Sequence, residues 1–174
     1  MKTLARQEIF QGRIIKVVKD DVELANGSKT TREVVFHNEA VAVAAVNENN
    51  EILMVTQHRY PIGRDMLELP AGLVDEGETP LDAAKRELLE ETGYQAAHWE
   101  QLTDIYTSPG CHNEKIYIFS ATGLSRISGQ RLDEDEILTF SCIPFEEVLE
   151  KVRNGRIMDA KTIIGILLCH IENS

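Results

Sequence analysis

The sequence has few cysteines, and those it has are scattered. Only Cys111, Cys142 and Cys169 occur in 174 residues, and no two of them form a CxxC pair. A disulfide framework or a structural zinc site needs cysteines that are paired or regularly spaced. The sequence therefore predicts neither of these, and it fits a reducing compartment best.

Positive charge is also scarce. Lysine and arginine together number 18 against 29 aspartates and glutamates, which leaves a net charge of −11. Proteins that follow a phosphate backbone present basic patches, so we expect no nucleic-acid partner. A small anionic substrate is still compatible with this charge, provided that metal ions or a few local arginines neutralise it.

Long apolar runs are missing as well. The longest, Ala40–Val46 and Ile163–Cys169, are too short to span a bilayer. The opening residues lack the apolar core of a signal peptide, and no phosphate-binding loop of the GxxxxGK[ST] type or HExxH zinc motif occurs. We therefore expect no membrane partner and a cytoplasmic location.

The remaining composition is that of a globular protein. Hydrophobic residues make up 43% and charged residues 27% of the chain, and the length suits one domain with its own core.

Asn26-Gly27 predicts a hairpin turn between strands at Arg13–Leu24 and Thr30–Phe36. Ala40–Val46 is typical of a strand buried on both faces. Further strands are expected at Glu51–Tyr60, Trp99–Thr107, Lys115–Gly123 and Ile137–Ile143.

One helix in the middle of the chain has clear start and stop signals. Thr79 is a suitable N-cap, Pro80 suits the first helical position, and Gly93 suits a left-handed C-cap. Two more helices are expected at Pro144–Asn154 and Asp159–Ile171. Strands around one helix, followed by helices, predict a mixed α/β domain.

The same central helix carries three closely spaced carboxylates, Glu87, Glu90 and Glu91. At 100° per residue they fall within an arc of roughly 100° beside the apolar side of the helix. Like charges at this spacing repel one another, so the pattern indicates either a solvated acidic face or a site for a hard cation. Mg²⁺ prefers such oxygen ligands and bridges them to substrate phosphates.

The spacing around these carboxylates resembles the Nudix box, G-x5-E-x7-R-E-U-x-E-E-x-G-U, in which U is a bulky apolar residue. Every position from Gly72 to Tyr94 matches, although the family more often has an aliphatic residue where Tyr94 stands. The resemblance implies an α/β/α sandwich with a mixed sheet. It also implies hydrolysis, dependent on Mg²⁺ or Mn²⁺, of a nucleoside diphosphate linked to another group.

Roles for the box residues follow from the resemblance. It implies that the metal ligands are Glu87, Glu90, Glu91 and the backbone carbonyl of Ala71. Glu78 would support the loop and the metal shell. Arg86 would hold the carboxylates in place, which suits the rigid fork of a guanidinium. Arg86 and Glu90 are accordingly predicted to take part in catalysis.

The flanks of the box resemble the ADP-ribose pyrophosphatase branch of the family. Leu67–Gly72 reads LELPAG, and Ser108–Gly110 places Pro109 sixteen residues after Gly93. The likeness implies cleavage of ADP-ribose to AMP and ribose 5-phosphate. It also implies a homodimer, in which an N-terminal antiparallel strand region (residues 1–36) serves dimerisation and the substrate pocket, and residues 37–174 form the core.

Substrate contacts are predicted from the same likeness. Arg32 and Arg59 match arginines of that branch, and guanidinium forks suit phosphate oxygens and bases. The alternative is that each is an exposed strand residue. Glu68 and Glu114 are further candidates for ribose or metal-water contacts.

A second acidic stretch, Arg131–Leu138, would by itself indicate a solvated loop. In the resembling branch, a glutamate from a loop at this point is the general base for the attacking water. Glu134 and Glu136 are both candidates, with Glu136 favoured because it adjoins a predicted strand.

Two rival functions stay open. One is hydrolysis of another nucleoside diphosphate derivative, such as GDP-mannose. The other is a non-catalytic nucleotide sensor, which the intact box disfavours.

Overall fold

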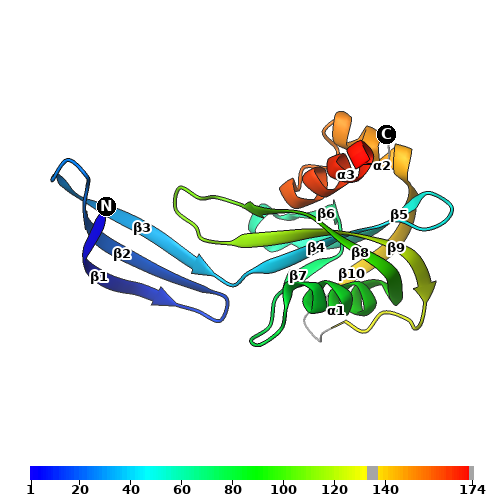
Figure 1. Cartoon of the computed structure of the whole chain (residues 1–174), viewed down its shortest axis with the longest axis horizontal. Coiled ribbons are helices and arrows are strands. Elements are labelled where there is room, and N and C mark those ends of the chain that lie inside the picture. Colours follow the sequence, from blue (N-terminus) through cyan, green and yellow to red (C-terminus); the bar gives the residue numbers. More distant parts are fainter. Residues whose placement is uncertain (133–136, 173–174) are drawn as a thin grey trace. The chain divides into compact units, whose positions relative to one another are not determined.

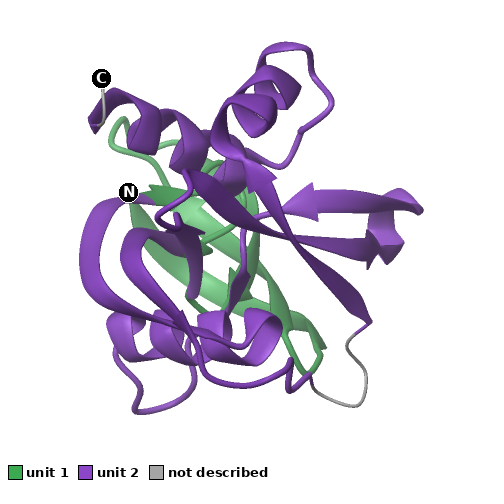
Figure 2. Cartoon of the chain, turned by 90° about the vertical axis from the view of Figure 1, so that its right-hand side faces the viewer, with its two compact units in different colours: residues 1–39, 105–115 green, residues 40–104, 116–174 purple. Residues whose placement is uncertain are grey.

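The computed structural model describes residues 1–132 and 137–172, which form two compact units (Figure 2). The first unit contains residues 1–39 and 105–115, and the second contains the rest. Segment 105–115 thus belongs with the N-terminal strands, although it is distant from them in sequence. The predicted boundary after residue 36 stays a prediction.

The first unit is built on an antiparallel sheet in the order β1-β2-β3. Its strands are β1 (Lys2–Gln11), β2 (Ile15–Glu23) and β3 (Lys29–His37). The predicted hairpin turn is confirmed: Gly27 has a φ of 80°, and the side chain of Asn26 accepts a hydrogen bond of 3.1 Å from the Ser28 amide. The sequence did not predict β1 as a separate strand. In the structure all its residues are exposed, so neither face of β1 is buried.

An ion pair holds β1 to β2. Arg6 donates to Asp20 through Nε and Nη2 at 2.8 and 2.7 Å, and its guanidinium lies 5.0 Å from the ring centroid of Phe36. These hydrogen bonds lower the pKa of the Asp20 carboxyl. The pairing accounts for a carboxylate that is only 5% exposed, on the same face of β2 as the buried Val18 and Val22.

The second unit contains two further sheets. One is antiparallel, in the order β10-β5-β6, and the other has the order β7-β4-β9-β8. Strand β4 runs antiparallel to β7 and parallel to β9, so the second sheet is mixed as predicted. The strands are β4 (Ala40–Ala45), β5 (Glu51–Arg59), β6 (Arg64–Glu68), β7 (Ala71–Leu73), β8 (Tyr94–Tyr106), β9 (Lys115–Arg126) and β10 (Leu138–Pro144), with a 3₁₀ turn η1 (Tyr60–Ile62) after β5.

Helices cover both sides of these sheets (Figure 1). α1 (Pro80–Thr92) packs on one face, and α2 (Phe145–Arg153) and α3 (Ala160–Glu172) pack on the other. β4 supplies both cores, because Val41 and Val43 face α1 while Ala44 faces α3. The α/β/α sandwich and the strand buried on both faces are confirmed.

The predicted helix ends are confirmed as well. Thr79 Oγ1 accepts from the Asp82 amide at 3.2 Å, and Gly93 is left-handed with a φ of 77°. Asp159 Oδ2 accepts from the Thr162 amide at 3.0 Å at the start of α3. Side-chain caps of this kind are worth about 1 kcal/mol each.

Helix α3 lies very close to the sheets because Gly165 has no side chain. A Cβ at Gly165 would lie 2.6 Å from Leu69 Cδ1, and both residues are buried. The start of α3 is thereby brought against the segment that joins β6 to β7. Among the described residues, none of the helices combines the length and apolar character that a membrane span requires.

Candidate active site

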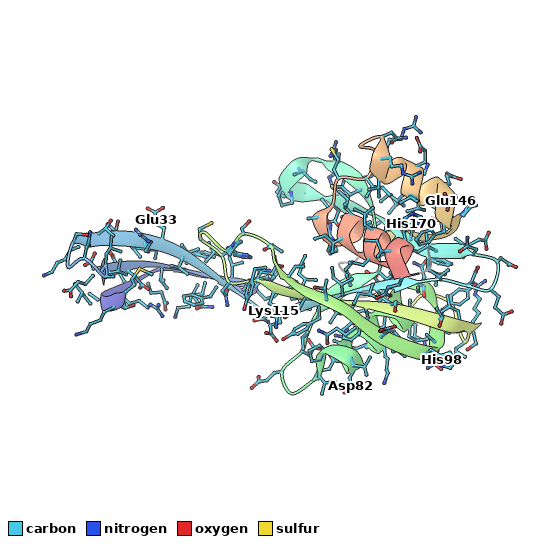
Figure 3. All side chains as sticks on the ribbon, turned by 45° about the horizontal axis from the view of Figure 1, so that its top comes forward. Glu33, Asp82, His98, Lys115, Glu146 and His170 are labelled. Atoms are coloured by element: carbon cyan, nitrogen blue, oxygen red, sulfur yellow. The ribbon has the colours of Figure 1, made fainter. Side chains whose placement is uncertain are left out.

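Helix α1 places its carboxylates at the edge of a core. Ala83, Ala84 and Leu88 pack against β4 and β5, and this orientation buries two of the neighbouring glutamates. Glu87 is 7% and Glu91 is 2% exposed, whereas the Glu90 side chain is 39% exposed. Buried carboxylates require cations or hydrogen-bond donors, and the last turn of α1, which carries Glu90 and Glu91, contains no basic residue. The start of the same helix is marked by the exposed Asp82 (Figure 3).

Arg86 supplies the positive charge. Its Nη1 donates to Glu87 Oε1 at 2.6 Å and to Glu90 Oε2 at 3.1 Å. Nε and Nη2 donate to the two oxygens of Glu78 at 3.0 and 2.9 Å, and Nη2 also reaches the Leu73 carbonyl at 2.9 Å. The structure therefore brings together Arg86 and three of the predicted site carboxylates.

These contacts shift the ionisation of the groups involved. The bonds to Glu78 raise the pKa of Arg86 well above its ordinary value, with Glu87 contributing further. The Arg86 bond lowers the pKa of Glu78, and a hydrogen bond from the Asp75 amide acts in the same direction. Both members of the pair are therefore held in their charged forms.

The loop before α1 contacts the carboxylates directly. A Cβ at Gly72 would lie only 2.0 Å from Glu87 Oε1, so glycine is needed for this approach. The Ala71 amide donates to Glu91 Oε2 at 3.0 Å. Residues 71 and 72 thus fix two of the three predicted ligands by backbone contact, and the Ala71 carbonyl belongs to the same segment.

The donor set has the right chemistry for a divalent metal. Three carboxylates and a backbone carbonyl are hard oxygen donors, and the missing Cβ of Gly72 leaves room for Glu87 beside the loop. Within residues 1–132 and 137–172, no three acidic, histidine or cysteine side chains already converge as a metal site. In this structure the Arg86 guanidinium bridges Glu87 and Glu90.

A second charge cluster lies at the end of β6. Arg59 Nε and Nη2 donate to the two oxygens of Glu68, both at 2.7 Å, and Lys161 Nζ donates to Glu68 Oε2. Lys161 also pairs with Asp159 at 3.0 Å. Burial raises the pKa of Glu68, but the Arg59 bond and the Lys161 charge outweigh burial, so the pKa lies below its ordinary value.

The burial of Glu68 bears on its predicted role. It is 1% exposed, whereas the Arg59 side chain is 39% exposed. An incoming substrate would therefore meet Arg59 first, and direct contact with Glu68 stays a prediction. Sequence reasoning missed Lys161. A lysine just after the predicted Asp159 cap gave no sign that its ammonium would be buried.

The other predicted substrate residues belong to the first unit. Arg32 is exposed, and its Nη1 donates to the Thr31 carbonyl at 2.9 Å. Glu114 accepts from Thr107 Oγ1 at 2.8 Å, and its oxygens lie 3.5 Å from His37 Nδ1 and 3.8 Å from His112 Nδ1. Glu134 and Glu136 lie outside the described residues.

Comparison with known proteins supports the family that this geometry suggests. The family model described as NUDIX domain matches residues 36–162. The chain belongs to the Nudix family. The model described as nucleoside diphosphate sugar hydrolase N-terminal domain matches residues 1–35. The predicted recognition of the family is confirmed, and α1 with its preceding loop is the Nudix box.

Full-length relatives show the same relationship. The chain is 43% identical to an ADP-ribose pyrophosphatase of Bacillus subtilis strain 168, and 41% identical to a methanol dehydrogenase activator of Bacillus methanolicus. Each alignment covers 99% of this chain and 94% of the relative. The crystal structure of an ADP compounds hydrolase superposes with a TM-score of 0.86 at 24% identity, covering 97% of this chain and 91% of that one. This superposition confirms the predicted Nudix fold.

The contact between Gly72 and Glu87 leads to a first prediction. Gly72→Ala forces Glu87 away from the loop, because the new Cβ would overlap Oε1. We expect Mn²⁺ affinity, measured by electron paramagnetic resonance titration, to fall about 10- to 100-fold. Gly129→Ala is the control, since a Cβ there meets nothing within 4 Å. Equal Mn²⁺ affinity in the two variants would contradict the assignment.

The lowered pKa of Glu78 predicts how stability depends on pH. Its folded-state pKa lies below the unfolded value of about 4.5, so the pairing with Arg86 stabilises the fold above that pH. The stabilisation is lost as the pH falls through the folded-state pKa. Glu78→Gln should therefore lower the free energy of unfolding at pH 7, and this difference from wild type should shrink towards pH 3. Urea titrations across this range measure it. Exposed Glu76→Gln should show no such trend.

Proposed function

We propose that this Nudix protein hydrolyses ADP-ribose to AMP and ribose 5-phosphate with Mg²⁺ or Mn²⁺. The supporting observation is the intact carboxylate helix, with Arg86 between Glu87 and Glu90 and the loop amide on Glu91. It occurs in a chain that aligns over almost its whole length with an ADP-ribose pyrophosphatase. A non-catalytic sensor would have no need to keep this arrangement.

Glu87, Glu90, Glu91 and the Ala71 carbonyl would hold the metal. A bound divalent ion would neutralise the diphosphate and lower the pKa of an attacking water. The protein's own task is to hold these oxygens in place. Arg86 does so for Glu87 and Glu90, while the backbone of residues 71 and 72 does so for Glu91 and Glu87.

Arg59 is the proposed diphosphate contact in the second unit. Glu68 engages its Nε and Nη2, and Nη1 has no hydrogen-bond partner in the described part of the chain. A guanidinium fixed along one edge can offer the other edge to a phosphoryl oxygen. Arg32 and Glu114 remain proposed contacts from the first unit, where Glu114 is held by Thr107.

The proposed dimer rests on the first unit. Strand β1 is exposed along its whole length, and Leu4, Ile9 and Phe10 are 43%, 55% and 53% exposed. Exposed apolar side chains on an edge strand favour pairing with another chain. We propose a homodimer through residues 1–36, and a cytoplasmic location in keeping with the three free cysteines.

The direct test is a substrate panel with purified protein and Mg²⁺ or Mn²⁺. ADP-ribose, ADP-glucose, GDP-mannose, NADH, diadenosine polyphosphates and 8-oxo-dGTP are compared by product chromatography. We expect ADP-ribose to be cleaved fastest and to yield AMP. Glu91→Gln should slow turnover at least about 100-fold with an unchanged circular dichroism spectrum. Faster cleavage of GDP-mannose would reassign the substrate, and no cleavage of any compound would favour a sensor.

The general base is proposed to be Glu136 or Glu134. A carboxylate with an ordinary pKa is ionised at pH 7 and can accept a proton from water. We expect Glu136→Gln to lower kcat much more than Glu134→Gln, with KM nearly unchanged in both. Steady-state kinetics of the two variants decide between them. Equal, small effects would place the base elsewhere.

A further inference from the structure

We propose that the first turn of α3 positions the substrate arginine, with Lys161 as the residue that acts through it. This turn, Asp159 to Thr162, holds Glu68 and Leu69, which begin the segment 68–71 that leads into the Nudix box, and it holds Arg59 by way of Glu68. The inference rests on the proposed function, because it assigns a supporting residue to the same site.

The buried carboxylate of Glu68 is held by two cations. Glu68 is 1% exposed, and Arg59 and Lys161 both donate to it. Lys161 is itself buried and pairs with Asp159 at 3.0 Å. Two positive and two negative groups thus balance one another. Removing Lys161 would leave Glu68 with one cation and would take the ammonium from Asp159, which keeps its hydrogen bonds from Thr162.

The same turn also holds the neighbouring backbone. The Leu69 amide donates to Thr162 Oγ1 at 2.9 Å, and Thr162 Oγ1 donates to Asp159 Oδ2 at 2.6 Å. Further along, the Val43 amide donates to the Pro70 carbonyl at 2.9 Å. Together with the bond from the Ala71 amide to Glu91, these contacts hold Leu69, Pro70 and Ala71, the three residues that follow Glu68.

The backbone of segment 68–71 and the side chain of Arg59 are held by different partners. The backbone of Leu69, Pro70 and Ala71 is held by Thr162, Val43 and Glu91. Of these contacts, the one from Thr162 to Leu69 is linked to Lys161, through Asp159, whereas the contact that holds Ala71 comes from α1. The direction of the Arg59 guanidinium depends on Glu68, one oxygen of which is shared with Lys161. Loss of Lys161 should therefore disturb Arg59 more than the metal ligands.

Arg59 lies close enough to the box for its direction to matter. After the dominant bond to Glu68, the charges of Asp159 and Glu91 also contribute to raising its pKa. The contacts agree with this, because Arg59 is bonded to Glu68, three residues before the predicted ligand Ala71. A cation that contacts the diphosphate in both the bound and the transition states affects KM more than kcat.

The test compares Lys161→Met with Lys161→Arg, using ADP-ribose as substrate. We expect Lys161→Met to raise KM about tenfold and to change kcat less than about threefold, and we expect the arginine to restore most of the loss. Lys151→Met is the matched control, because Lys151 pairs with Glu147 on α2 away from this cluster. A wild-type KM in Lys161→Met would overturn the proposal.

A double-mutant cycle shows whether Lys161 acts through Arg59. In the Arg59→Ala background, Lys161→Met should cause no further rise in KM, since the guanidinium that it positions is gone. If the full effect of Lys161→Met persists in that background, Lys161 acts by another route. If Lys161→Met does not fold, Lys161→Gln replaces it in the same double-mutant cycle. Glutamine keeps a hydrogen-bond donor but removes the charge.

A measurement without substrate or metal separates this inference from the proposed function. In ¹⁵N spectra, the Arg59 Nε–H signal, assigned by its loss in Arg59→Lys, should exchange slowly with water because it is bonded to Glu68. Lys161→Met should speed this exchange, and Lys151→Met should not. If wild type cleaves no ADP-ribose but the exchange behaves as stated, only the proposed function fails. Unchanged exchange would refute the positioning role.

Discussion

Mutual repulsion of carboxylates is the constraint around which the site is built. Glu87, Glu90 and Glu91 lie on one side of α1, and two of them are buried. Arg86 relieves this repulsion by placing one guanidinium among Glu78, Glu87 and Glu90, and the Ala71 amide donates to Glu91. The same guanidinium reaches the Leu73 carbonyl, so the charge that permits the helix also holds the loop before it.

In the second charge cluster, on the side of the sheets that α3 covers, a buried carboxylate is again neutralised by cationic side chains. Glu68 is buried between Arg59 and Lys161, and Lys161 comes from α3 rather than α1. The short chain segment from Glu68 to Leu73 therefore runs between two charge networks, one supplied by each helix layer. Removing one partner of a buried ion pair typically costs about 3–5 kcal/mol, which makes the position of this segment well determined.

Local signals in the sequence predicted the helices and most strands well. The ends of α1 follow from Thr79 and Gly93, whose effects depend only on adjacent residues. Strands β6 and β7 were not anticipated, because they are short and separated only by Leu69 and Pro70. β6 forms a hairpin with β5 across the turn η1, whereas β7 pairs with β4, which is a long-range interaction.

The order and spacing of the box residues were determined by the sequence itself, since they lie within one helix and its loop. Those residues identified the family and the chemistry of the metal donors. Tertiary structure decided which cations meet the buried Glu68. Glu68 meets Lys161 from 93 positions later in the chain. No local sequence pattern predicts this pairing, because the two side chains meet only when α3 packs against the sheets through Gly165 and Leu69.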